Sequence, residues 1–278
     1  MDLSGFNLVA RFLGFGNLND FNQTMLIRTT IAISALLLRA ATAQAQQGYE
    51  FEVYGTGIPA RGAGELELHT NFVPSGSQLV DDDEGRATHR AFRSSLELST
   101  GLASWLEAAF YAVSYSRNGA GVQYVGNRAR FTAVAPGRWN LPFDVGLSQE
   151  VGYARPGFAE NRWGYEVTPI LGKEMGSVSV LLNPAFERGL GSGEHEWEFE
   201  PRARFGYTLG DEEAVGLEYY SVLGAVSSFD TRSHQRHQLF ATGTTDLTGG
   251  MEAALGIGRG LTRNSDRWVI TTRLELKF

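Results

Sequence analysis

The last stretch of the chain, residues 266–278, constrains the fold more than any other part of the sequence. Between Arg267 and Phe278, apolar residues and threonines alternate with residues that are mostly charged. Because the side chains of a β-strand point alternately to its two faces, this pattern predicts a strand with one apolar and one charged face. Such a strand suits the wall of a barrel or the core of a soluble sandwich, so the rest of the chain has to distinguish them.

The same alternation recurs along most of the chain after residue 64. It predicts about twelve strands in all, each long enough to cross a membrane when tilted. The predicted strands are 65–72, 93–98, 105–115, 123–133, 141–153, 163–171, 178–186, 196–209, 215–222, 235–245, 251–257 and 266–278. A further candidate for a short strand is 51–54. No helical period persists beyond residue 45, so the predicted fold class is all-β.

Two prolines weaken this interpretation locally. Pro184 and Pro201 lie inside the predicted strands 178–186 and 196–209. Each would lose a ladder hydrogen bond there, because proline has no backbone N–H. The prediction of these two strands therefore depends on the alternation of the neighbouring residues.

The connections between the predicted strands alternate in length. Short turns are predicted at 101–104, 136–140, 174–177, 210–213 and 246–250. Longer connections are predicted at 74–88, 154–162, 189–195 and 224–233, with shorter exceptions at 117–121 and 262–265. Since outer-membrane barrels have short turns on one rim and long loops on the other, the alternation favours a single closed antiparallel up-and-down transmembrane β-barrel of about twelve strands at 65–278. An even number of strands places both ends on the short-turn, periplasmic rim, where we expect a lead segment at 46–64.

The orientation of the two faces follows from the cost of placing charge in lipid. An arginine near the bilayer midplane destabilises a barrel by about 2–4 kcal/mol, so the charged faces are predicted to point into the lumen. The candidate lumen-lining residues are Glu65, Glu67, His69, Arg93, Glu97, Arg128, Arg130, Glu150, Glu166, Glu198, Glu200, Arg202, Arg204, Glu218, Glu252, Arg273 and Glu275. Both signs of charge are present near balance. This suits either an internal salt-bridge network or a polar path for a small solute.

An export signal is predicted at residues 25–45. Arg28 supplies a positive start, an apolar run follows, and 43–45 has the small-x-small pattern of a cleavage site. The upstream residues 1–24 are interpreted as an over-extended N-terminus, with a short amphipathic cap as the alternative. On either interpretation the mature chain is exported.

Composition excludes several other classes of protein. The 278-residue chain has a formal charge of -7, which gives no electropositive footprint for nucleic acid. It has no cysteine, which excludes disulfides and thiolate metal sites and is compatible with an oxidising compartment. Outside the export signal, no apolar run of about 20 residues could form a membrane-spanning helix.

No catalytic, cofactor-binding or metal site is predicted. Asp230, His234 and His237 include potential metal ligands, but their spacing suits neither a helix face nor a strand face. The acidic run at 81–84 could attract Ca²⁺ or bridge lipopolysaccharide, although a solvated loop is the simpler interpretation. Serines and histidines occur in the loops without a recognisable motif, so no enzymatic activity is expected.

Two features resemble known families. The terminal Phe278 resembles the last-strand signal of Gram-negative outer-membrane β-barrels, which implies recognition by the barrel assembly machinery. Residues 51–54, followed by 64–71, resemble small outer-membrane transporters, some of them of the phenol-degradation-pathway (MetA-like) type. The resemblance implies a location in the cell outer membrane, contact with its lipid and lipopolysaccharide, and passage of an unidentified small solute.

The favoured function is therefore a passive channel or transporter for small solutes with a narrow charged lumen. Two alternatives stay open at this point. A structural or lipid-modifying outer-membrane barrel with a plugged lumen would show no conductance. A secreted soluble β-sandwich would have two open sheets with the aromatic residues between them.

Overall fold

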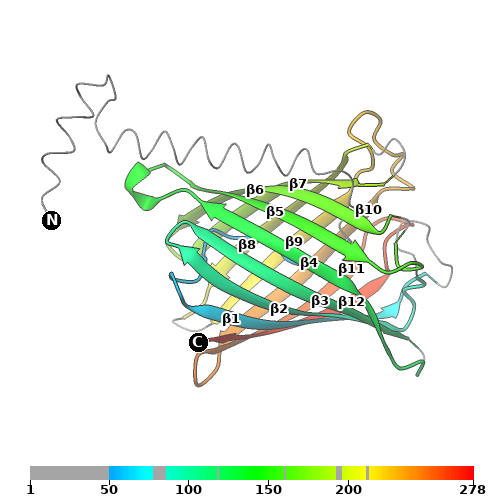
Figure 1. Cartoon of the computed structure of the whole chain (residues 1–278), viewed down its shortest axis with the longest axis horizontal. Helices are drawn as coiled ribbons and strands as arrows, with labels where there is room; N and C mark the ends of the chain where they lie inside the picture. Colours follow the sequence, from blue (N-terminus) through cyan, green and yellow to red (C-terminus); the bar gives the residue numbers. More distant parts are fainter. Residues whose placement is uncertain (1–49, 78–85, 118, 160, 192–195, 211–212) are drawn as a thin grey trace, which may run out of the picture. The chain divides into compact units, whose positions relative to one another are not determined.

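A computed structural model describes residues 50–77, 86–117, 119–159, 161–191, 196–210 and 213–278. They form a closed barrel of twelve antiparallel strands, in which each strand pairs with its sequence neighbours and β1 pairs with β12 (Figure 1). The strands are β1 (Gly64–Ser75), β2 (Ala91–Ala103), β3 (Leu106–Arg117), β4 (Val122–Val134), β5 (Asp144–Ala154), β6 (Trp163–Met175), β7 (Val178–Gly189), β8 (Glu198–Thr208), β9 (Glu213–Val222), β10 (Arg236–Asp246), β11 (Met251–Gly260) and β12 (Trp268–Lys277). The predicted all-β, up-and-down barrel is confirmed, and two open sheets are excluded.

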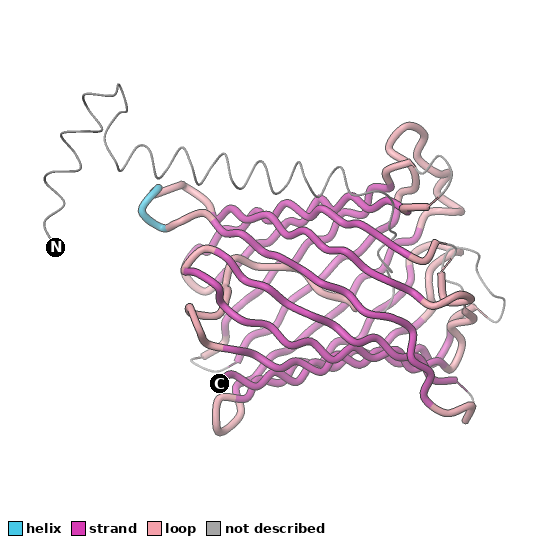
Figure 2. Tube along the Cα trace, viewed as in Figure 1, coloured by secondary structure: helices cyan, strands magenta, loops and turns pink. Residues whose placement is uncertain are grey.

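Helix is scarce among the described residues (Figure 2). A 3-10 turn, η1 (Gly137–Trp139), lies in the connection between β4 and β5. No helix of the described part of the chain is long and apolar enough to cross a membrane. The predicted export signal at 25–45, the upstream segment 1–24 and the acidic run at 81–84 lie outside the described residues and stay predictions.

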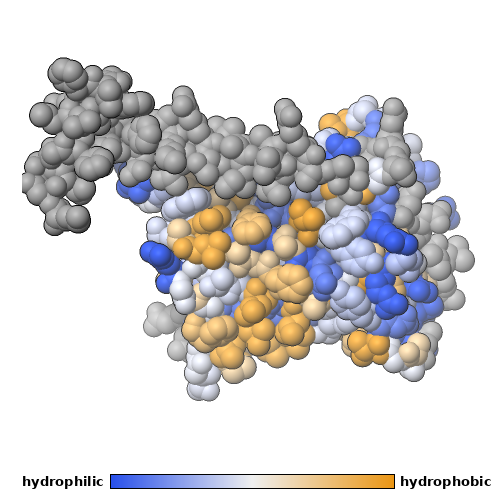
Figure 3. All heavy atoms as spheres, in the orientation of Figure 1, coloured by the Kyte–Doolittle hydropathy of each residue, from blue (hydrophilic) through white to orange (hydrophobic). Residues whose placement is uncertain are grey.

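Side chains alternate between the interior of the barrel and its outer wall. In β2, Arg93 and Glu97 are buried inside, whereas Phe92 and Leu98 are 48% and 53% exposed on the outside. Figure 3 shows apolar side chains gathered over the outer wall of the visible face, with hydrophilic residues more frequent towards the right-hand rim. An exposed apolar surface of this extent requires an apolar neighbour, and for a closed barrel that neighbour is lipid.

The two rims differ in the length of their connections. The rim where β1 begins and β12 ends, called the terminal rim, carries tight turns such as the one between Met175 and Val178. The opposite rim, called the loop rim, carries longer connections such as the one between Ser75 and Ala91. The predicted alternation of short and long connections is confirmed, including a short β3–β4 connection on the loop rim, except that the β4–β5 connection on the terminal rim is long instead of a tight turn.

Several strand boundaries differ from the predicted ones. β2 continues to Ala103 instead of ending at residue 98, and Gly101 lies inside the strand instead of in a turn. A side chain at Gly101 would collide with the backbone carbonyls of Pro59 and Ala60, so the glycine permits a close approach of two chain segments. β5 begins at Asp144, three residues later than predicted, after a connection that contains η1.

Three prolines lie side by side in the wall. Pro184 on β7 is the register partner of Pro201 on β8, and the register of β6 with β7 places Pro169 level with Pro184. The pairing of β6 with β7 is interrupted between Val167 and Leu171, where these prolines lie. The strands therefore continue through the prolines, and the lost N–H donors appear as a local gap in one ladder.

Candidate functional site: the barrel interior

Residues 50–54 of the lead segment lie inside the barrel (Figure 1). Further along the segment, Gly62 donates its backbone N–H to the carbonyl of Gly101, and Gly64 exchanges backbone hydrogen bonds with Phe278 at the terminal rim. The short strand that we expected at 51–54 does not form, and only the last residues of the segment lie at the rim where we expected all of it. Glu50 and Glu52 alternate with apolar residues along an extended segment. Its charged and its apolar side chains contact different parts of the barrel wall.

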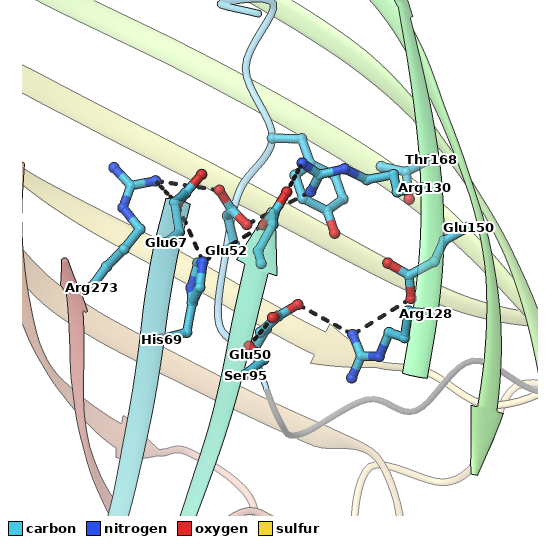
Figure 4. Close-up of polar contacts among 12 residues, drawn as sticks. Glu50, Glu52, Glu67, His69, Ser95, Arg128, Arg130, Glu150, Thr168 and Arg273 are labelled. Atoms are coloured by element: carbon cyan, nitrogen blue, oxygen red, sulfur yellow. Dashed lines mark hydrogen bonds and ion pairs between the residues drawn. The ribbon is translucent and has the colours of Figure 1, made fainter. Parts of the chain in front are cut away.

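The two glutamates of the lead segment bind to charged and polar groups on the wall. Glu50 accepts a hydrogen bond from the Ser95 hydroxyl, and its Oε2 lies 3.2 Å from Nη1 of Arg128. Figure 4 shows Glu52 between arginines of two different strands. Its Oε1 lies 3.3 Å from Nη1 of Arg273, and its Oε2 lies 4.0 Å from Nη1 of Arg130. The hydrogen bond connects the segment to β2, and the ion pairs connect it to β4 and β12.

A buried amide side chain fixes the backbone of the lead segment. Asn183 on β7 is fully buried, and its Oδ1 accepts the backbone N–H of Tyr54 at 2.6 Å. Its Nδ2 donates to the Tyr54 carbonyl at 3.0 Å. The side chain thus replaces the two hydrogen bonds that a neighbouring strand would supply. Buried backbone N–H and C=O groups need hydrogen-bond partners. Because Asn183 supplies both partners for Tyr54, it fixes where Tyr54 lies against β7.

The apolar residues of the lead segment pack on the opposite side. The ring of Phe51 lies 5.2 Å from that of Tyr220 and 4.7 Å from that of Phe240, measured between centroids. Val53 joins the same cluster, together with Val269 of β12. The interior therefore contains a small apolar core between the segment and the β9–β12 part of the wall, beside the charged groups.

All the predicted lumen-lining residues lie on the inward side of their strands. Ten of them are buried, namely Glu67, His69, Arg93, Glu97, Arg128, Arg130, Glu150, Glu166, Glu200 and Glu275. Glu65, Glu198, Arg202, Arg204, Glu218, Glu252 and Arg273 are half-buried. Their role in conduction stays a prediction, as does the role of the exposed Phe278 in assembly.

Arg130 on β4 is the centre of one charged cluster. Its Nη2 lies 2.6 Å from Oε1 of Glu97 and 3.0 Å from Oε1 of Glu107, on β2 and β3. Its guanidinium carbon lies 4.6 Å from the ring centroid of Tyr54 and 5.2 Å from that of Tyr111. Charge pairing and cation–π contact together compensate for the burial of this arginine.

Arg273 on β12 is the centre of a second cluster. Its Nη2 lies 2.6 Å from Oε1 of Glu252, and its Nη1 lies 3.7 Å from Oε2 of Glu67. His69 approaches the same Glu67 oxygen through Nε2 at 3.2 Å. A single arginine is thus shared among several carboxylates, including Glu52 of the lead segment. The interior is a connected ion network on this side.

Four inward glutamates were missed from the sequence: Glu50, Glu52, Glu107 and Glu187. Glu107 shares its face of β3 with Ala109 and Tyr111, so the face did not stand out as charged. Glu187 lies just beyond the predicted end of its strand at residue 186, although its parity matches that of the buried Asn183. The two lead-segment glutamates carried an alternation signal that we assigned to a short strand.

These additions change the charge of the interior. The described inward glutamates are Glu50, Glu52, Glu65, Glu67, Glu97, Glu107, Glu150, Glu166, Glu187, Glu198, Glu200, Glu218, Glu252 and Glu275. The described inward arginines and lysine are Arg93, Arg117, Arg128, Arg130, Arg202, Arg204, Arg236, Arg273 and Lys277, which are fewer than the glutamates. The expected near balance of charges is therefore wrong, and the interior is acidic.

Two small cavities flank the lead segment, each with a volume of about 60 Å³. The first is bordered by Glu50 and Tyr54 of the segment and by Arg202 and Arg236 of the wall. Each cavity has room for a few water molecules.

Two groups of side chains in the described interior have the ligand geometry of a metal site. One consists of Glu52, His69 and Glu97, and the other of Glu166, Glu187 and Glu200. In each group the candidate ligand atoms lie within 4.8 Å of one another. By contrast, the ring of His237 contacts the Tyr219 hydroxyl at 2.5 Å and the Gln235 side chain at 2.9 Å.

Comparison with solved structures reveals barrels of the same fold. An outer membrane channel from Pseudomonas putida F1 has a TM-score of 0.55 at 12% identity, covering 82% of this chain and 100% of that one. The KdgM porin in complex with disordered oligogalacturonate has a TM-score of 0.51 at 10% identity, covering 77% and 99%. The NanC porin has a TM-score of 0.51 at 8% identity, covering 76% and 97%. No family model and no curated protein matches the chain.

Proposed function

We propose that the protein is an outer-membrane channel for small solutes that favours small cations over anions and is narrowed by residues 50–60. The observation that carries the proposal is the excess of inward glutamates over inward arginines along a closed wall. Rings of acidic side chains make a pore cation-selective, because they lower the energy of a cation inside it and raise that of an anion.

Three observations support the outer-membrane location. The outer wall exposes large apolar side chains, for example Phe110 and Leu255, each 53% exposed. The barrels with which the chain shares its fold include an outer membrane channel and porins. The sequence also predicts an export signal. Outer-membrane lipid, lipopolysaccharide and the barrel assembly machinery are the partners that this proposal implies.

The solute class is the least constrained part of the proposal. The resemblance to phenol-degradation-pathway transporters implies nothing about which solute passes, and the KdgM structure contains an oligogalacturonate. An acidic interior disfavours polyanions of that kind, since like charges repel strongly where water is sparse. We therefore propose small cationic or neutral solutes.

A plugged barrel is the second candidate, and a specific observation favours it. The lead segment is held by ion pairs of Glu50 and Glu52 and by two hydrogen bonds between Asn183 and the Tyr54 backbone. If this segment never leaves, the barrel does not conduct. The full chain and a variant that lacks residues 50–60 distinguish the two functions.

The test measures conductance and reversal potential in a planar bilayer under a KCl gradient. The channel proposal expects conductance by the full chain with a reversal potential that indicates preference for K⁺. Conductance by the deletion variant alone would support the plugged barrel, and preference for Cl⁻ would contradict the cation proposal. Silence of both proteins would contradict a channel of any kind.

A matched pair of variants locates the selectivity. Changing Glu218 and Glu252 to Gln removes two half-buried inward charges and should reduce the preference for K⁺. Glu213→Gln makes the same substitution at an exposed residue where β9 begins, and should leave the reversal potential unchanged.

A further inference from the structure

Four glutamates form a continuous row across the inner wall near the loop rim. Glu150 on β5 is the register partner of Glu166 on β6, which is the partner of Glu187 on β7, which in turn is the partner of Glu198 on β8. Glu200 follows on the same face of β8. Like charges directly opposite each other on neighbouring strands are destabilising, so this row requires compensation.

Arginines compensate only part of the row. Nη1 of Arg128 lies 3.5 Å from Oε1 of Glu150. Nη2 of Arg202 lies 2.5 Å from Oε2 of Glu166 and 3.9 Å from Oε2 of Glu200. Arg236 of β10 borders the neighbouring cavity. The remaining carboxylate of the row is that of Glu187.

Glu187 is buried, and the charge of Arg202 attracts it without forming an ion pair with it. Its exposed fraction is 5%, and it makes no hydrogen bond or ion pair with any residue that the structure describes. Oε2 of Glu200, which is 2% exposed as a residue, also lacks a hydrogen bond there. A buried carboxylate without a countercharge is strongly unfavourable, so the group has to be neutralised by a proton or by a bound cation.

The geometry suits a cation. Oxygens of Glu166, Glu187 and Glu200 all lie within 4.8 Å of one another. Ca²⁺ accepts oxygen ligands at about 2.3–2.6 Å in irregular arrangements, and this spacing is compatible with one ion shared by the three carboxylates. Oε1 of Glu166 accepts the Thr168 hydroxyl at 2.6 Å and Oε2 accepts from Arg202, so this carboxylate is held in place.

We propose that Glu166, Glu187 and Glu200 bind one divalent cation, with Ca²⁺ preferred, inside the barrel near the loop rim. Three carboxylates on three paired strands form a preorganised oxygen site, and Ca²⁺ tolerates irregular oxygen coordination better than Mg²⁺ does. The ion would join β6, β7 and β8 beside the three prolines, where the β6–β7 pairing is interrupted. This site does not depend on whether the barrel conducts.

The other acidic group of the interior carries no such inference. Glu52 and Glu97 already have Arg130 and Arg273 as partners at 2.6 to 4.0 Å. These guanidiniums occupy the charge-compensating role that a metal ion would have. The group containing Glu187 differs because Glu187 forms no ion pair with a described residue.

The test is calorimetric titration of CaCl₂ into the folded, chelator-treated full chain in detergent. We expect one site with a Kd below about 1 mM, and a Ca²⁺-dependent rise in the unfolding temperature. Glu187→Gln keeps the side-chain size and should weaken binding by at least about tenfold, because affinity follows the number of charged ligands. Glu200→Gln provides a second variant with the same expectation.

The matched control is Glu275→Gln. Glu275 is also a buried inward glutamate, but it lies near the terminal rim and its Oε1 is paired with Lys277 at 2.9 Å. This variant should bind Ca²⁺ as the unmodified chain does. The proposal is overturned if the unmodified chain takes up no Ca²⁺ at millimolar concentration, or if neither Glu187→Gln nor Glu200→Gln weakens uptake. Either result would indicate that a proton neutralises Glu187.

Discussion

The interior wall has two sides that treat buried glutamates in different ways. On the β1–β4 side, Glu97 and Glu107 share Arg130, and the lead segment adds Glu52 to the same guanidinium. On the β5–β8 side, Glu187 lies between other glutamates of the row and forms no ion pair with a described residue, because the nearby Arg202 is paired with Glu166. On both sides of the wall, buried glutamates occupy inward-facing positions of the strands. The difference teaches that neighbouring strands, and not the strand itself, decide whether a buried charge is compensated.

The largest expected effect comes from removing the shared arginine of the β1–β4 side. Arg130→Met leaves the buried Glu97 and Glu107 without their closest countercharge. Breaking a buried pair from one side costs about 3–5 kcal/mol, so the free energy of unfolding should fall by that amount. Urea unfolding of the barrel in detergent measures it.

Arg204→Met is the control for that change. Arg204 is half-buried and lies 3.6 Å from Glu218, so its loss should cost much less. Equal losses for the two variants would show that burial and sharing do not distinguish the two arginines.

An intermediate effect is expected where the lead segment is anchored to the β5–β8 side. Asn183→Leu removes both hydrogen bonds to the Tyr54 backbone and leaves a buried N–H and C=O unsatisfied. The expected cost is about 1–3 kcal/mol. Release of the segment should also make residues 50–60 sensitive to added protease. Asn127→Leu alters an asparagine on the outer face of β4 and should leave the segment protected.

The smallest effect tests the comparison most directly. The change from Glu to Gln should alter the stability of the barrel with opposite sign on the two sides of the wall. Without divalent cations, Glu187→Gln relieves like-charge repulsion across strands and should stabilise the barrel by about 0.2–1 kcal/mol. Glu97→Gln weakens the 2.6 Å pair with Arg130 and should destabilise it. The same sign for both variants would contradict the distinction between the two sides.

The fold followed from local alternation along the chain. Each predicted strand has its counterpart in the barrel, and the last strand, β12, pairs with β1 and closes it. The alternation also separated inward from outward residues, because a one-residue shift along a strand would place charged side chains against lipid. Some of the missed boundaries lie where glycine or proline interrupts the pattern, as at Gly101.

The amino-acid sequence alone was enough to predict the all-β fold class and the inward side of every candidate lumen-lining residue. The folded barrel was needed to show that residues 50–54 occupy the interior and that Glu150, Glu166, Glu187 and Glu198 lie abreast. The physical reason is that a two-residue slip between neighbouring strands preserves every face while exchanging every cross-strand partner. The alternation within a strand decides whether a side chain points inward or outward. The register of the closed barrel decides which side chains of the neighbouring strands lie opposite it.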